Sequence, residues 1–148
     1  MNYGGHKMGG IVTSVITAVT TLYFTHDFIV TAIATVSTFL FALYPDMDIH
    51  STPRKMFLPI GLVAMLVLFA LGHYHTCMAL TVLLIFPLTQ KHRGIVHSLL
   101  GMVLASLLWN YTVSTLSPTT WLNGYLYGVA AVVGYLTHLT LDTHFKLV

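Results

Sequence analysis

The chain has very little charge. Charged residues make up 7% of its 148 positions, and the four acidic residues are all aspartate, since glutamate does not occur. Soluble domains carry about a quarter charged residues, so this composition, with 56% hydrophobic residues, predicts an integral membrane protein. One cysteine, Cys77, excludes an internal disulfide. A net charge of +2 offers no basic surface, and we expect no direct nucleic-acid partner.

Six apolar stretches divide the chain. Repeated apolar runs without β-style alternation predict an all-α, polytopic transmembrane bundle of about five to six helices, forming a single domain over residues 1–148. A straight crossing needs about 20 residues, so the last two stretches are long enough and the second and third nearly so. The first is marginal, and the fourth is short and contains Pro87. The stretches are Gly10–Phe24, Phe28–Tyr44, Met56–Gly72, Thr76–Leu88, Ile95–Val113 and Trp121–Leu141.

The order of these stretches predicts which polar residues meet. If each stretch crosses the membrane once, the start of the chain and the segments after the second, fourth and sixth stretches share one side. Every lysine and arginine falls on that side, and basic residues mark the cytoplasmic face. We therefore expect both termini in the cytoplasm. The basic residues are Lys7, Arg54, Lys55, Lys91, Arg93 and Lys146.

Two motifs on the shared side carry carboxylates. His138 and Asp142 are four residues apart, so they share a helix face and suit two ligands of one metal ion. The alternative is an ordinary His–Asp hydrogen bond. Asp46 and Asp48 follow Pro45 and provide hard oxygen donors suited to Mg²⁺, Mn²⁺ or Zn²⁺. Their alternative is a solvated turn.

A third motif combines histidine with arginine. His92 precedes Gly94 in a loop, and His97 is expected in the first turn of the fifth helix. That helix N-terminus and Arg93 together favour an anion, above all a phosphate. The alternative is an ordinary basic loop. Because ionisable groups near lipid are costly, their gathering with His6 on one face indicates a functional site.

Taken in order, these motifs resemble the YdjM-like family of predicted membrane-bound, metal-dependent hydrolases, also described as LexA-binding inner-membrane proteins. The resemblance covers nearly the whole chain and implies an inner-membrane location. More remotely, the family is similar to the zinc-dependent phospholipase C and P1-type nuclease group, which implies phosphoester hydrolysis. The motifs that carry it are His6, Pro45-Asp46-Met47-Asp48 with Ser51, His92-Arg93-Gly94-Ile95-Val96-His97-Ser98, and Gly134-Tyr135-Leu136-Thr137-His138 with Asp142.

The candidate ligands are too many for one ion, since zinc takes about four. We predict two divalent ions, Zn²⁺ before Mn²⁺ or Mg²⁺, or one ion with the remaining groups as acid, base and outer ligands. Asp46 and His97 are the predicted catalytic groups, because glutamate is absent, and Arg93 is predicted to hold phosphate oxygens. The seven candidate ligands are His6, Asp46, Asp48, His92, His97, His138 and Asp142.

The predicted function is a membrane-embedded hydrolase acting on a lipid or lipid-linked phosphate at the cytoplasmic face. The alternative is a metal-binding protein without catalysis: a sensor, a transporter or a regulatory interaction protein. Membrane lipids are the expected surroundings, and the sequence is compatible with a homo-oligomer. His73 and His75 could form a metal-binding pair, but a polar turn at the interface is the preferred interpretation.

Overall fold

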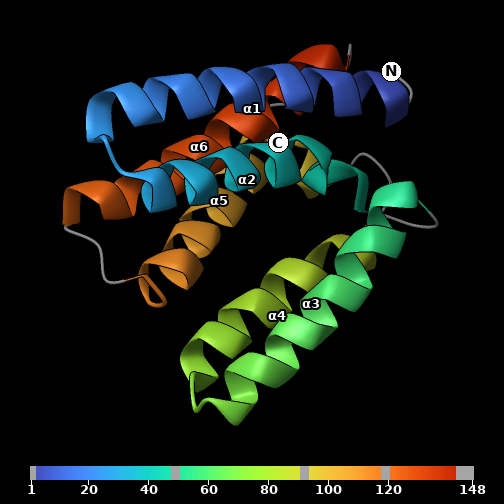
Figure 1. Cartoon of the computed structure of the whole chain (residues 1–148). Coiled ribbons are helices and arrows are strands. Elements are labelled where there is room, and N and C mark those ends of the chain that lie inside the picture. Colours follow the sequence, from blue (N-terminus) through green and yellow to red (C-terminus); the bar gives the residue numbers. More distant parts are fainter. Residues whose placement is uncertain (1–2, 48–50, 91–93, 118–120, 143–148) are drawn as a thin grey trace.

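The computed structural model describes residues 3–47, 51–90, 94–117 and 121–142, without the side chains of residues 3 and 121–124. Within them the chain is all-helical, which confirms the predicted fold class (Figure 1). Two short 3₁₀ segments, η1 (Tyr44–Met47) and η2 (Ile95–His97), adjoin the α-helices. The six α-helices are α1 (Tyr3–Thr25), α2 (Phe28–Leu43), α3 (Thr52–Ala70), α4 (Tyr74–Thr89), α5 (Leu99–Ser114) and α6 (Trp121–Leu141).

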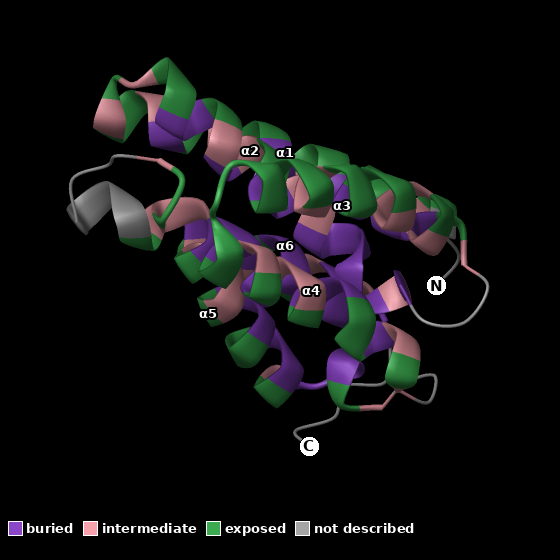
Figure 2. Ribbon diagram, turned by 90° about the horizontal axis from the view of Figure 1, so that it is seen from below, coloured by how far each residue is buried: buried purple, intermediate pink, exposed green. Residues whose placement is uncertain are grey.

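Among the described residues, three segments are long and apolar enough to cross a membrane: Gly4–Thr25, Phe28–Met47 and Thr52–Ala70. The shorter apolar helices are Tyr74–Thr89, Leu99–Ser114 and Tyr125–Leu141. Large apolar side chains lie exposed along the outer faces of α1 and α3, where a lipid environment would cover them (Figure 2). The architecture therefore agrees with a protein that passes through the membrane several times.

Two predicted lengths are wrong. The first stretch is not marginal, because α1 has 23 residues and continues through the polar start of the chain, including His6 and Lys7. The fifth helix has only 16 residues, since Ser98 caps it and the residues before Ser98 form η2. An apolar run alone reveals neither feature, because both depend on how the helix ends pack.

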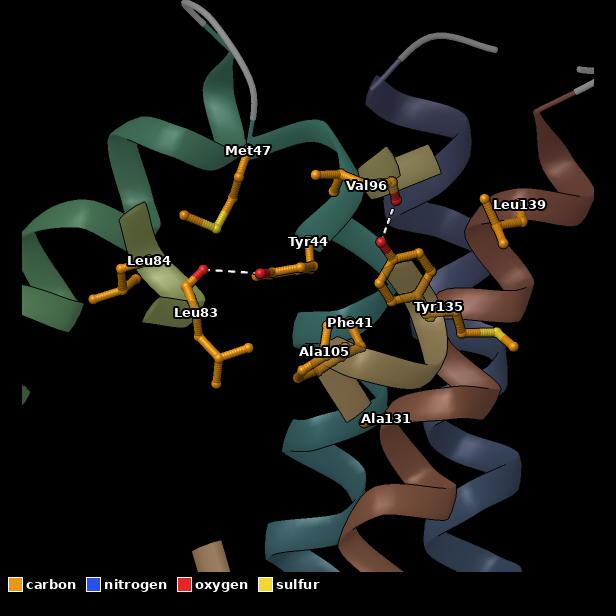
Figure 3. Packing of buried hydrophobic residues seen from close by; sticks show 11 residues of the cluster. Phe41, Tyr44, Met47, Leu83, Leu84, Val96, Ala105, Ala131, Tyr135 and Leu139 are labelled. Atoms are coloured by element: carbon orange, nitrogen blue, oxygen red, sulfur yellow. Dashed lines mark hydrogen bonds between the residues drawn. The ribbon is translucent and has the colours of Figure 1, made fainter. Parts of the chain in front are cut away.

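Helix α2 lies at the centre of the bundle, packed against α1 and α6, and α5 packs on α6 (Figure 1). Helices α3 and α4 form a hairpin beside this bundle, joined to it by contacts of α4 with α5 and of α3 with η1. The buried core crosses both parts: Phe41 and Tyr44 stack on one another at 5.2 Å, and Tyr135 lies against both (Figure 3).

Asp27 begins the return from α1 to α2. Its carboxylate accepts hydrogen bonds from the N–H groups of Ile29 at 2.8 Å and Val30 at 3.0 Å, which caps α2. His26, just before it, adopts a φ of 52°. This tight connection makes α1 and α2 antiparallel, so the start of α1 lies beside the end of α2.

Candidate metal centre

His6 is buried in the first turn of α1, with 2% of its surface exposed. Two glycines follow it. A Cβ at Gly10 would lie 2.8 Å from the Ala42 Cβ, and one at Gly9 would lie 2.5 Å from a side-chain atom at the end of α6. Glycine therefore lets α1 approach both neighbouring helices. As a result the His6 ring stacks on the His138 ring, with centroids 3.9 Å apart and planes 15° apart.

Asp46 lies in η1, where the chain leaves α2. Pro45 has no N–H and is disfavoured inside an α-helix, which agrees with the change to 3₁₀ geometry. The Tyr44 hydroxyl donates to the Leu83 carbonyl on α4 at 2.8 Å, and Met47 is fully buried. Both ends of η1 are thus anchored, while the Asp46 side chain keeps 21% exposure.

His97 ends η2, so the prediction that it lies in the first turn of the fifth helix is wrong. Ser98 is the reason: its hydroxyl accepts a hydrogen bond from the Gly101 N–H at 3.1 Å and caps α5. The preceding residue is also fixed, because the Tyr135 hydroxyl on α6 donates to the Val96 carbonyl. Ser98 and Tyr135 together hold the short segment that carries the His97 ring.

His138 is completely buried near the end of α6. Its Nδ1 lies 2.9 Å from the carbonyl oxygen of Ala42 on α2. A carbonyl can only accept, so Nδ1 carries the hydrogen, and Nε2 of the neutral ring holds a lone pair. Metal-ligating histidines are commonly oriented in this way by a hydrogen bond from the other ring nitrogen.

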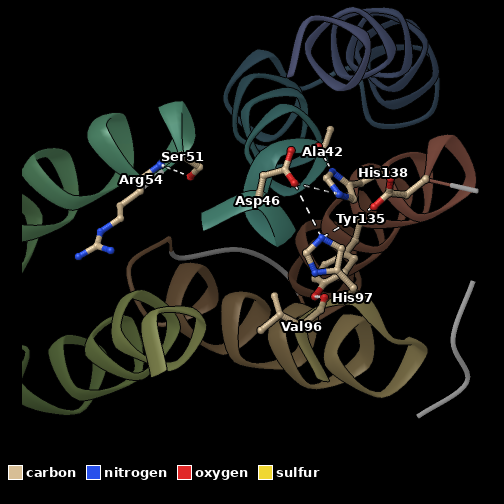
Figure 4. A network of polar contacts seen from close by, with 9 residues as sticks. Ala42, Asp46, Ser51, Arg54, Val96, His97, Tyr135 and His138 are labelled. Carbon is tan, nitrogen blue, oxygen red and sulfur yellow. Dashed lines mark hydrogen bonds and ion pairs between the residues drawn. The ribbon is translucent and has the colours of Figure 1, made fainter. Parts of the chain in front are cut away.

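The rings and carboxylates converge at one end of the bundle (Figure 4). Asp46 Oδ1 lies 3.6 Å from His138 Nε2 and 3.8 Å from His97 Nε2. His97 Nε2 is also 3.9 Å from Asp142 Oδ2. These distances exceed those of hydrogen bonds, yet they approach the roughly 3–4 Å between two ligands that each lie about 2 Å from one zinc ion.

Two sets of three residues have donor atoms within 4.8 Å of one another: His6, His138 and Asp142, and Asp46, His97 and His138. His138 belongs to both sets. Because the His138 Nδ1–H donates a hydrogen bond to the Ala42 carbonyl oxygen, only Nε2 is available as a metal ligand. The two sets therefore form one continuous cluster of five residues, which we call the His–Asp cluster.

The chemistry of the His–Asp cluster fits a divalent metal ion. Within the described residues, the buried atoms His138 Nε2 and His6 Nδ1 have no hydrogen-bond partner. An unsatisfied buried polar atom costs about 1–3 kcal/mol. Asp46 and Asp142 add two carboxylates to this largely buried region, and their charge would balance one divalent cation. A donor set of imidazole and carboxylate suits zinc or manganese.

Several candidates are not among the five residues of the His–Asp cluster. Asp48, His92 and Arg93 lie outside the described residues, as do His50 and His144. His26 and His73 belong to the α1–α2 and α3–α4 connections, and His75 lies in the first turn of α4, all away from the cluster ends of these helices. The Arg54 side chain points away from the cluster (Figure 4).

The sequence analysis predicts no role for the two groups that orient the histidine rings of the cluster, the Ala42 carbonyl and the Tyr135 hydroxyl. The Ala42 carbonyl, which fixes the His138 ring, leaves no signal in a residue pattern. Tyr135 does leave one, because it lies three residues before His138 on the same helix face and is polar in an apolar helix.

A family model described as YdjM inner membrane protein matches residues 1–146. The matched range contains all five residues of the His–Asp cluster. The match confirms two predictions: the family resemblance that the motifs carry, and the inner-membrane location. No curated protein and no solved structure shows significant similarity to the chain.

Proposed function

The chain belongs to the YdjM inner membrane protein family, and we propose that it is a metal-dependent hydrolase of phosphoester bonds in lipids or lipid-linked phosphates. The observation that carries the proposal is the His138 ring: its Nδ1 is bonded to the Ala42 carbonyl, and its Nε2 is buried and faces Asp46. Without a cation, a lone pair would face a carboxylate there, so the arrangement favours a metal ion at this position.

We propose zinc as the ion, with manganese or magnesium as alternatives, and two ions at the full site. A pair of ions needs a bridging ligand, usually a carboxylate. Asp46 would hold one ion with His97 and His138, because its Oδ1 lies near both Nε2 atoms, and its second carboxylate oxygen would be the proposed link to the other ion. Asp48 and His92 would complete the ligand set.

A bound divalent ion would supply a water of lowered pKa and would offset charge on a phosphoryl group. The residues of the chain would do the rest. With one ion bound, the cluster residues that do not hold the ion would transfer protons, and His97 and Asp46 are the proposed groups, since each is at the cluster and Asp46 retains contact with solvent. Arg93 would hold phosphate oxygens in a bidentate manner. A lipid substrate follows from the membrane location of the cluster.

Metal analysis of the purified protein tests the proposal first. We expect about one to two zinc ions per chain, with losses in Asp46→Ala and His97→Ala, because each removes a donor from the cluster. His73→Ala is the matched control, since His73 belongs to the α3–α4 connection. Phosphodiester and lipid phosphate substrates should then be cleaved by the loaded protein, and a chelator should stop the reaction. A content of less than about one ion per chain that neither substitution changes would contradict the proposed metal site.

A structural metal site is the second candidate function. It is favoured by one observation: the five cluster residues come from α1, η1, η2 and the end of α6 with Asp142, which directly follows it. An ion would therefore tie four segments together. A transporter fits less well, because transport sites usually lie near the bilayer midplane at broken helices, whereas the cluster lies at helix ends. Zinc that raises the melting temperature without any hydrolysis would favour the structural role.

The cytoplasmic position of the cluster is also a proposal, supported by the distribution of basic residues. It is tested by replacing Cys77 and placing single cysteines in His50→Cys and Ser117→Cys. An impermeant reagent applied to intact cells should label position 117 and not position 50. Labelling of position 50 alone would reverse the orientation.

A further inference from the structure

An apolar cavity of about 400 Å³ separates the α3–α4 hairpin from α2 and α5. This volume falls within the range of small-molecule sites in proteins. Its walls come from both parts of the fold, so the cavity lies between the hairpin and the bundle. The residues that define it best are Leu40, Phe41, Phe57, Ala64, Leu80 and Trp109.

The few polar atoms in the walls already have partners. The Tyr44 hydroxyl donates to the Leu83 carbonyl at 2.8 Å. Trp109 Nε1 donates to the Ser37 hydroxyl at 2.8 Å, and the Thr112 hydroxyl donates to a carbonyl of its own helix at 2.8 Å. No wall group is left to recognise a polar molecule, so the cavity suits hydrocarbon.

The cavity shares a wall with the His–Asp cluster. Tyr44 and Met47 line the cavity and are three residues apart in η1, where 3₁₀ geometry places them on the same face. Asp46 lies between them in sequence, and its carboxylate lies beside His97 and His138. Figure 3 shows Tyr44 and Met47 directed toward Leu83 and Leu84 of α4. One short segment thus has an apolar face and an ionic face.

The length of the cavity also identifies an occupant. Its lining on α3 runs from Met56, near the cluster end, to Leu68. At 1.5 Å per residue this stretch spans about 18 Å, which is somewhat more than half of the ~30 Å hydrocarbon thickness of a bilayer. A molecule that fills it is as long as the acyl chain of one leaflet.

We infer that this cavity holds an acyl chain of a lipid phosphate whose head group reaches the His–Asp cluster. The inference rests on the proposed function and makes it narrower: the substrate is a membrane lipid with a phosphate at its polar end, bound along α3. A water-soluble phosphoester would occupy the cluster without the cavity.

Trp109 provides a direct measurement, because it lines the cavity and only one other tryptophan, Trp121, exists in the chain. The test uses Trp121→Phe protein loaded with zinc in phosphatidylcholine nanodiscs. Phosphatidic acid with brominated acyl chains is added, and brominated phosphatidylcholine serves as the comparison lipid. Bromine quenches tryptophan only at short range, so Trp109 fluorescence reports an acyl chain in the cavity.

We expect saturable quenching by brominated phosphatidic acid at a low mole fraction, reversed by unbrominated phosphatidic acid. Ala64→Phe fills the cavity and should raise the half-saturating fraction about tenfold. Ala70→Phe is the matched control, because Ala70 is exposed on the same helix and does not line the cavity. It should leave the quenching unchanged, and the zinc content of both variants verifies that the cluster is intact.

Quenching that rises linearly with mole fraction, equally for both lipids and both variants, would overturn the inference, because it is the behaviour of surrounding lipid. The two proposals fail separately. Saturable quenching without hydrolysis supports the chain-binding cavity and contradicts the hydrolase. Hydrolysis of phosphatidic acid without saturable quenching supports the hydrolase and contradicts the cavity's role.

Discussion

The central bundle and the α3–α4 hairpin are both helical and apolar, yet their helices meet in different ways. In the bundle, a Cβ at Gly134 of α6 would collide with the Thr38 carbonyl oxygen of α2. In the hairpin, a Cβ at Gly61 of α3 would meet only the flexible end of the Leu84 side chain on α4. Backbone packed on backbone cannot adjust, whereas a leucine can rotate. The rigid contact lies beside the His–Asp cluster, and the adaptable one lines the cavity.

Polar contacts add to the fixed packing of the bundle. The Thr38 hydroxyl lies 3.1 Å from the Thr17 hydroxyl on α1 and 3.1 Å from the Ala130 carbonyl on α6, so one side chain joins three helices of the bundle. Such hydrogen bonds between helices contribute about 0.6 kcal/mol each in membranes. The bundle therefore holds its helices in one register, as a metal site with oriented ligands requires. The hairpin needs only to enclose hydrocarbon.

The largest expected effect comes from His138→Ala. This change removes the nitrogen that both sets of donors share and leaves the Ala42 carbonyl without its donor. We expect zinc affinity to fall more than about 100-fold, beyond the 10–100-fold that loss of an outer-sphere partner causes. Zinc titration by isothermal calorimetry measures it. His75→Ala, in the first turn of α4, should leave zinc affinity unchanged, and equal losses in both variants would contradict a site at the bundle end.

Gly134→Ala tests the rigid contact. The new methyl group would push α6 away from α2. The clash lies one helical turn from the hydrogen bond between His138 and the Ala42 carbonyl. Overpacking of this kind costs about 1–3 kcal/mol, and we expect zinc affinity to fall with stability because the His138 ring is displaced. Thermal unfolding in detergent, with and without zinc, measures both. A full zinc affinity in a destabilised protein would show that ligand orientation does not depend on this contact.

Tyr135→Phe is expected to have a smaller effect on the His–Asp cluster. It removes the hydroxyl that donates to the Val96 carbonyl and leaves η2, with His97, less well fixed. We expect about tenfold weaker zinc binding and a loss of stability of about 1 kcal/mol. Tyr23→Phe is the control, because Tyr23 is 71% exposed on α1. An unchanged zinc affinity in Tyr135→Phe would mean that Ser98 alone positions His97.

The sequence predicts the meeting of distant polar residues because that meeting depends on helix order. Antiparallel neighbours alternate in direction, so the start of α1 and α5 and the end of α2 and α6 share one side. His6 and Asp142 could therefore be placed together without any knowledge of packing angles. Their roles as metal ligands remain a prediction.

The sequence does not reveal what depends on local packing. Ser98 shortens α5 through a cap, and Gly9 and Gly10 let the start of α1, which continues through His6, lie against two helices. Hydrophobic patterning measures the length of an apolar run and is insensitive to both. The Ala42 carbonyl is equally hidden, because every residue carries a carbonyl and only the register of α2 on α6 selects this one.

Gly61→Ala should have the smallest effect, and it is the matched counterpart of Gly134→Ala. The substitution is the same, but its methyl group meets the Leu84 side chain, which can adopt another rotamer. We expect a stability change within about 1 kcal/mol and an unchanged zinc affinity, measured by the same unfolding and titration experiments. If Gly61→Ala weakened zinc binding as much as Gly134→Ala, the hairpin and the bundle would be mechanically coupled. The rigid register of α2 on α6 would then not be sufficient to build the His–Asp cluster.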